Sequence, residues 1–244
     1  MHGGWMRSAL VAMAVGTLAA ACGSGSAPSD RPSPGDTHLL RELPDRWADR
    51  VDNPWLPLTP GSRWEYRTTT PDGKERTVVT VLRQTRNVAG VRAVVVHDRV
   101  TSASGRLIED THDWYAQDRT GTVWYLGEAT TAFGKGKPTH EGSWEAGVNG
   151  AKAGIAMLGK PRAGASYQQE FYRGHAEDQG EVLAVNASAK GPIGKWSGVV
   201  KTRDTTPLEP DVIEYKYYVR GIGLVEERAP TEHEHTVLVA FKRG

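Results

Sequence analysis

Short runs of β-branched and aromatic residues, separated by glycine, proline and asparagine, fill the chain from Arg63 almost to its end. No long helical period lies between these runs. Such spacing is typical of antiparallel strands joined by turns and not of βαβ units. We expect an all-β protein, with strands at 63–70, 77–82, 91–100, 107–116, 122–128, 167–172, 181–185, 198–202, 212–219, 223–227 and 233–241.

The predicted strands also recur in order. GSRWEYR, TVVTVL, VAGVRAVVV and DWYAQDRTGTVWYLGE have counterparts in GASYQQEF, GEVLAV, GPIGKWSGVV and KYYVRGIGLVEE. This favours an internal duplication of a unit of about 100 residues, with copies at about 55–130 and 160–244. Two such copies would form one half-barrel or barrel-like antiparallel sheet, or two packed sheets. The alternative is that unrelated β-meanders look alike.

The first 21 residues have the layout of a secretory signal, because Arg7 precedes an apolar run from Ala9 to Ala21. That run is too short to span a bilayer, which takes about 20 residues. The segment LAAAC, ending at Cys22, resembles a bacterial lipobox, although Ala19 stands where leucine is usual. Met6 is a possible alternative start.

Cys22 is the only cysteine of the chain, and lipidation would explain an unpaired thiol in a secreted protein. The alternative is a secretory signal that is cleaved without lipidation, so that the cysteine has no function. We expect a signal at 1–21, a Gly/Ser/Pro-rich tether at 22–37 and a β-rich domain at 38–244. The protein would then lie outside the cytoplasm, anchored to the cell membrane by its N-terminal lipid.

The chain lacks the usual signatures of catalysis and of nucleic-acid binding. The net charge of +1 gives no electrostatic case for nucleic acid. The nucleophile motifs G-x-S-x-G and S-x-x-K are absent, as are H-E-x-x-H and a phosphate-binding glycine loop. These absences favour a binding protein over an enzyme, and no cofactor is predicted.

The segment DTHDWYAQDRTGTVWYLGE predicts a β-hairpin whose turn runs from Asp118 to Gly121. Aspartate suits the first position of a type I turn, and glycine accepts the left-handed conformation of a bulged hairpin. Counting outward from a facing pair of Asp118 and Thr122 places Ala116 opposite Trp124.

The same register places Trp114 opposite Leu126 and His112 opposite Glu128. These five residues (His112, Trp114, Trp124, Leu126 and Glu128) form a candidate pocket, with the apolar side chains inside and the pair at the mouth. A carboxylate beside an imidazole can orient a general base, or can be a cross-strand pair at the rim.

Two further groups are candidate metal ligands. Glu141, Glu145, Glu177 and Asp178 lie in predicted loops, and either coordinate calcium or are solvated charges. His233 and His235 are two apart on a predicted strand, so they either share one face and bind zinc or copper, or mark a solvated edge.

Four segments carry a resemblance to a known family: DNPWLPLTPGSRWEYR, EDTHDWYAQDRTGTVWYLGE, EGSWEAGVNGAKAGI and LEPDVIEYKYYVRGIGLVEE. Over roughly Asp52 to Glu227 the chain resembles secreted bacterial proteins and lipoproteins that are frequent in actinobacteria and have no established activity. The resemblance implies export but no catalytic residues. GIGLVEE after a tyrosine-rich strand also looks like the closing strands of the LolA and LolB lipoprotein carriers, whose half-barrel holds an acyl chain.

These features favour a lipid-anchored binding protein for an apolar small molecule, a lipid or another envelope component. One alternative is an envelope hydrolase or metal-dependent enzyme that uses His112, Glu128 and the loop from Glu141 to Glu145. The other is a structural, protein-binding module with a filled interior and an exposed apolar patch.

Overall fold

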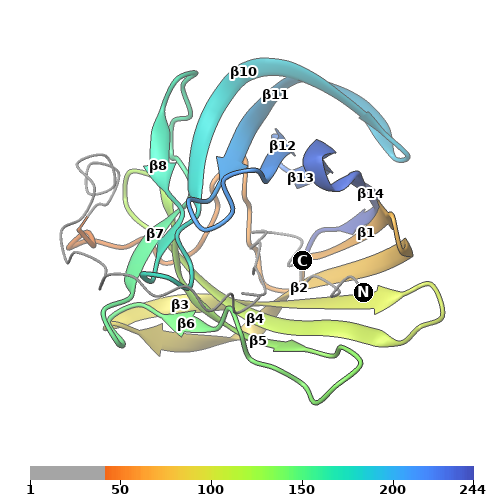
Figure 1. Cartoon of the computed structure of the whole chain (residues 1–244). Helices are drawn as coiled ribbons and strands as arrows, with labels where there is room; N and C mark the ends of the chain where they lie inside the picture. The colour runs from red at the N-terminus through yellow and green to blue at the C-terminus, as the bar shows by residue number, and fades with distance from the viewer. Residues whose placement is uncertain (1–41) are drawn as a thin grey trace.

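The computed structural model of this chain describes residues 42–244, which form one antiparallel sheet of 14 strands (Figure 1). The all-β prediction is confirmed. The predicted signal, the tether and Cys22 lie outside the described residues. The strands are β1 (Arg63–Thr70), β2 (Gly73–Val88), β3 (Val91–Ser102), β4 (Leu107–Gln117), β5 (Val123–Ala132), β6 (Trp144–Glu145), β7 (Lys152–Met157), β8 (Ser166–Gln168), β9 (Glu170–Phe171), β10 (Gln179–Gly191), β11 (Gly194–Thr205), β12 (Ile213–Val219), β13 (Gly223–Ala229) and β14 (Glu234–Lys242).

The sheet curls round until its two ends meet. Its strand order is β8-β10-β11-β12-β13-β14-β1-β2-β3-β4-β5-β7-β9, with β6 also pairing with β5. In Figure 1, β10 to β13 arch over the interior and face β2 to β5 on the opposite side. The architecture is therefore a barrel-like sheet, as the sequence predicts.

One stretch of chain joins the two ends of the sheet. Ser166–Gln168 pairs with β10, and two residues later Glu170–Phe171 pairs with β7. Gly154 on β7 makes this switch of partner possible, because a Cβ at that position would lie 2.2 Å from the Gln169 backbone. Only a glycine lets the two backbones approach so closely.

The side chains that point into the barrel are identified by their interactions across it. The Tyr115 hydroxyl on β4 interacts electrostatically with the Tyr218 hydroxyl on β12. Glu170 on β9 interacts in the same way with Asp113 on β4 and with Lys216 on β12. Because side chains alternate along a strand, Asp110, His112 and Trp114 project from the opposite face. We call the two faces inner and outer.

A bulge in the β4–β5 hairpin changes the predicted pairing. Ala116 faces Trp124 as expected, but Trp114 faces Gly127 and Asp113 faces Glu128. The predicted pairs of Trp114 with Leu126 and of His112 with Glu128 are therefore wrong. Leu126 is the extra residue of the bulge, and Gly127 has a φ of +133° that other residues rarely adopt.

The two halves of the sheet follow the same order of pairing. β1 to β5 pair in sequence, and so do β8, β10, β11, β12 and β13. The β12–β13 hairpin carries a bulge between Tyr217 and Tyr218, as β4–β5 does between Trp114 and Tyr115. The predicted duplication requires this order, and the duplication itself stays a prediction.

Helical structure is almost absent from residues 42–244. The 3-10 turn η2 (Pro230–Glu232) precedes β14. Among the described residues, no helix combines the length and the apolar character needed to cross a membrane.

We expect Gly127→Ala to lower the free energy of unfolding by about 3 kcal/mol or more. A Cβ at this position would lie 2.3 Å from the Trp144 carbonyl oxygen, so β6 would have to move away from β5. Urea denaturation followed by tryptophan fluorescence measures the loss.

Gly90→Ala is the matched control, because Gly90 also has a positive φ, +81°, but a Cβ there would meet nothing within 4 Å. This change should cost only about 1–2 kcal/mol. Equal losses in the two variants would show that the close approach of β6 does not constrain Gly127.

Candidate functional site

The turn of the β4–β5 hairpin is held by the carboxylate of Asp118. Its Oδ1 accepts hydrogen bonds from the backbone N–H groups of Thr120 (2.8 Å) and Thr122 (3.1 Å), and its Oδ2 accepts one from Trp124 Nε1 (3.0 Å). Gly121 closes the turn with a φ of +89°. The predicted turn is confirmed, and Asp118 serves as its structural centre.

The chain before β1 docks against this turn. The amide of Gln117 receives hydrogen bonds on Oε1 from the backbone N–H groups of Asp52 and Asn53, at 3.0 and 2.7 Å. Its Nε2 donates to Asp52 Oδ1 at 2.8 Å. The Trp47 ring lies edge-on to the Trp124 ring, 6.2 Å between centroids. These contacts fix residues 47–53 beside β4 and β5.

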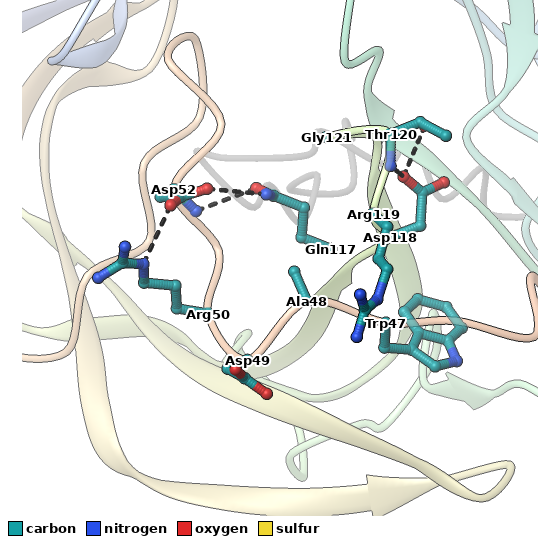
Figure 2. A pocket seen from close by; sticks show the side chains of 10 residues that line it. All are labelled: Trp47, Ala48, Asp49, Arg50, Asp52, Gln117, Asp118, Arg119, Thr120 and Gly121. Atoms are coloured by element: carbon teal, nitrogen blue, oxygen red, sulfur yellow. Dashed lines mark hydrogen bonds and ion pairs between the residues drawn. The ribbon is translucent and has the colours of Figure 1, made fainter.

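A cleft of about 850 Å³ opens between the docked segment and the turn (Figure 2). Its lining residues are Trp47, Ala48, Asp49, Arg50, Asp52, Gln117, Asp118, Arg119, Thr120 and Gly121. Most of them are polar or charged. The lining therefore suits a polar ligand.

Some charged side chains of the cleft have a hydrogen-bond or ion-pair partner within residues 42–244, and others have none there. Arg50 Nε donates to Asp52 Oδ2 at 3.0 Å, and Asp118 is committed to the turn. Asp49 and Arg119 make no hydrogen bond or ion pair with other described residues. One anionic and one cationic side chain therefore remain to contact a ligand.

The inner face of β4 and β5 carries a second group of ionisable side chains. Asp113 and Glu128 face one another next to the bulge, and both are almost completely buried. Tyr125 donates a hydrogen bond of 2.7 Å to Asp113 Oδ1 and stacks on Tyr115. Trp144 Nε1 donates to Glu170 Oε2 at 2.9 Å. Carboxyl and aromatic groups thus fill this side of the interior.

Burial changes the protonation of these carboxyls. It raises the pKa of Asp113 to about 7, against an ordinary value near 3.8. It also raises the pKa values of Glu128 and Glu170 well above normal, with the nearby Asp113 adding to the rise for Glu128 and Asp178 for Glu170. A buried carboxyl favours its neutral form, so this cluster keeps protons at pH values at which exposed carboxyls are ionised.

A buried lysine occupies the corresponding place in the other half of the sheet. Lys216 Nζ lies 2.7 Å from Asp204 Oδ2 and 3.4 Å from Glu214 Oε2. Burial opposes the charged form of Lys216, but the Asp204 and Glu214 carboxylates overcome this effect and raise its pKa. The β12 side of the interior is therefore held by a buried ion pair.

The predicted pocket does not assemble as expected. Glu128 points inward, whereas His112 faces Ala129 and projects outward, so the two cannot form an acid–base pair. Trp114 and Trp124 are also on the outer face, where the guanidinium of Arg86 covers the Trp114 ring at 4.1 Å. The predicted position of Trp114 and Trp124 inside the barrel is therefore wrong.

The four predicted acidic ligands do not converge on one site among the described residues. Glu141 is exposed, and Glu145 on β6 forms an ion pair with Arg86 at 2.7 Å. Glu177 accepts a hydrogen bond from the Gly174 backbone N–H, whereas Asp178 is buried. Within residues 42–244 these side chains form no cluster that could hold a metal ion.

His233 and His235 do not share a strand face. His233 precedes β14 and has a left-handed backbone, with a φ of +58°. His235 lies within β14 and contacts Glu226 at 2.8 Å. The assumption behind the predicted histidine metal site is therefore wrong, because the strand begins one residue later than expected.

The cleft itself was not predicted. The segment from Trp47 to Asn53 has neither strand periodicity nor a motif, and its position depends on contacts with Gln117, more than 60 residues away. The only signal for it in the sequence is the set of polar residues around Asp118, which the turn alone is sufficient to explain.

No family model matches this chain, and no curated protein matches it. Two solved structures are similar. A "putative exported protein with YmcC-like fold" from Bacteroides fragilis is 15% identical, has a TM-score of 0.43, and covers 78% of this chain and 99% of its own. A "putative lipoprotein" from Parabacteroides distasonis is 12% identical, has a TM-score of 0.41, and covers 80% and 100%. At this level of similarity they carry no information about the cleft.

The inner carboxyls should make the protein less stable as pH rises. Between its ordinary pKa and about 7, Asp113 is protonated in the native state and ionised in the unfolded chain. The native state then binds more protons, so the free energy of unfolding falls with increasing pH. We expect Asp113→Asn, which stays neutral, to reduce this fall by about 1 kcal/mol per pH unit over that range.

Urea denaturation between about pH 5 and pH 7.5 measures this dependence. Asp72→Asn, in the exposed β1–β2 turn, is the control and should keep the wild-type dependence. An Asp113→Asn variant with an unchanged dependence would mean that Asp113 is already ionised in the native protein.

Proposed function

We propose that this chain is a lipid-anchored, extracytoplasmic binding protein whose cleft binds a small polar molecule, or part of an envelope component, that carries both positive and negative charge. The observation that supports this most strongly is a pair of charged side chains, Asp49 and Arg119, that have no hydrogen-bond or ion-pair partner within residues 42–244 and line a cleft of about 850 Å³. Ligand sites of small molecules have volumes in this range.

Each charged side chain would recognise a different part of the ligand. Asp49 suits an ammonium or guanidinium group, whereas the planar fork of Arg119 suits a carboxylate or phosphate. Both are carried by backbone that is already fixed, because Asp118 holds the turn and Gln117 holds the docked segment. A fixed site loses less entropy when a ligand binds.

A polar ligand has more support than the apolar one favoured by the sequence. A second cleft, of about 600 Å³, is likewise lined mainly by polar and charged side chains, namely Ser188, Lys190, Lys195, Ser197, Glu226 and Arg228, beside Ala189, Trp196 and Tyr217. The inner face carries carboxyls and tyrosines. The catalytic alternative loses its main support because His112 and Glu128 are on opposite faces.

The cellular location in this proposal rests on the N-terminal sequence. The signal layout of residues 1–21 and the lipobox-like LAAAC support export and lipidation of Cys22. The Gly/Ser/Pro-rich residues 22–37 would then separate the β-domain from the membrane surface.

The cleft is tested by native mass spectrometry of the full chain purified from a bacterial envelope, measured before and after denaturation. We expect the wild-type protein to release a small polar molecule. Asp49→Asn combined with Arg119→Gln should release little or none, because both charge contacts are lost.

A double variant at remote surface positions, Asp72→Asn with Arg162→Gln, makes the same charge changes and should retain the molecule. Equal retention by the cleft variant would place the ligand elsewhere. Release of a molecule of lipid mass would instead support the apolar ligand.

Cys22→Ser should release the protein from the membrane, since it removes the thiol that would carry the lipid. Fractionation of cells that express the wild-type and variant chains measures this directly, and mass spectrometry of the wild-type N-terminus should show an added acyl mass. A variant that stays in the membrane fraction would contradict anchoring through Cys22.

A further inference from the structure

Three side chains with metal-binding atoms meet on the outer face of β3 and β4. His97 and His112 are directly opposite one another in the two strands, and Asp110 precedes His112 by two residues on the same face. Their ligand atoms all lie within 4.8 Å of one another. Among the described residues no other group of three histidines, cysteines or carboxylates meets this criterion.

The contacts within the cluster centre on one carboxylate oxygen. Asp110 Oδ1 lies 3.0 Å from His97 Nε2 and 3.8 Å from His112 Nδ1. The two imidazole rings stack, with 4.3 Å between centroids and 14° between planes. All three side chains are partly exposed, so solvent and ions can reach them.

The strands give this cluster a rigid support. β3 pairs with β2 on one side and with β4 on the other, and β4 also pairs with β5, so both strands lie in the interior of the sheet. Ligands on such strands are positioned more precisely than ligands on loops. The cluster therefore needs only side-chain rotations to close around an ion.

We propose that His97, Asp110 and His112 bind a divalent transition-metal ion of the zinc class. Two imidazole nitrogens and one carboxylate oxygen are a ligand set that suits zinc and neighbouring metals, and not calcium or magnesium, which prefer oxygen alone. Three protein ligands leave at least one coordination position open to water or to a second molecule. The site shares no residue with the cleft and is independent of the proposed function.

The β11–β12 pair, which follows the same order of pairing in the other half of the sheet as β3–β4, lacks these ligands. Arg203 faces Tyr215 there, as His97 faces His112, and Ile213 stands two residues before Tyr215. Arg203 pairs with Glu181 at 2.5 Å. A metal site is therefore expected in one half only, with a stoichiometry of one ion per chain.

Arg99 competes with metal binding, so its removal provides a test in which affinity should rise instead of fall. Its Nε lies 3.1 Å from Asp110 Oδ2, so the guanidinium competes with a metal for the carboxylate. Removing it should strengthen metal binding while removal of a ligand weakens it. Contamination by a metal-binding tag or by an unrelated surface site would not respond in these two opposite ways.

The probe is Zn²⁺, titrated by isothermal calorimetry into the untagged full chain carrying Cys22→Ser, so that no thiol competes for the metal. We expect one Zn²⁺ per chain and no displacement by excess Mg²⁺. His112→Ala and Asp110→Asn should each weaken binding by about 10- to 100-fold or more. Arg99→Ala should tighten it by about twofold to fivefold.

His235→Ala is the matched control, because His235 also contacts a carboxylate, Glu226 at 2.8 Å, but belongs to no group of three metal-binding side chains within residues 42–244. It should leave Zn²⁺ binding unchanged. Asp110→Asn keeps the shape of the side chain, so a folded protein with weakened binding separates loss of a ligand from loss of structure.

Absence of Zn²⁺ binding in the wild-type background would overturn the proposal. So would unchanged affinity in both His112→Ala and Asp110→Asn, or an equal loss of affinity in His235→Ala.

Discussion

Closing a sheet around ionisable side chains forces their charges to be neutralised, and this constraint governs the interior of the protein. Burial favours the neutral carboxyl and raises the pKa values of Asp113, Glu128 and Glu170, which lowers the charge on their side of the interior. Lys216 meets the constraint on the opposite side by pairing with a buried carboxylate. An isolated buried charge would be too costly, so each half of the interior needs one of these two ways of removing it.

The polar interior determines what the outer face can do. Since the inward positions of the β4–β5 hairpin are taken by carboxyls and tyrosines, Trp124 points outward and needs another partner. The chain before β1 supplies one through Trp47, and the same docking creates the polar cleft beside the turn. The cleft is thus a consequence of how the barrel distributes its aromatic and ionisable residues.

Local patterns in the sequence are sufficient to predict most of the strands and the turn at Asp118, but not β6, β7 or the inner face. The turn at Asp118 follows from its own side-chain chemistry. The bulge at Leu126 shifts the pairing beyond it by one residue, which moves Glu128 from the face of His112 to the face of Asp113. A glycine inside a predicted strand was the available signal. β7, with its KAGIAM sequence, was missed because small residues have little strand preference and its pairing depends on distant parts of the chain.

The central claim is that the inner carboxyls keep their protons in the native protein well above the pH at which exposed carboxyls ionise. Carbon-detected NMR of the side-chain carboxyl groups, followed through a pH titration of the folded chain, measures this for Asp113 and Glu128 individually. The account predicts that Asp113 titrates near pH 7 and that Glu128 remains protonated well above its ordinary pKa. Titration of both groups near pH 4, as in exposed carboxyls, would contradict it.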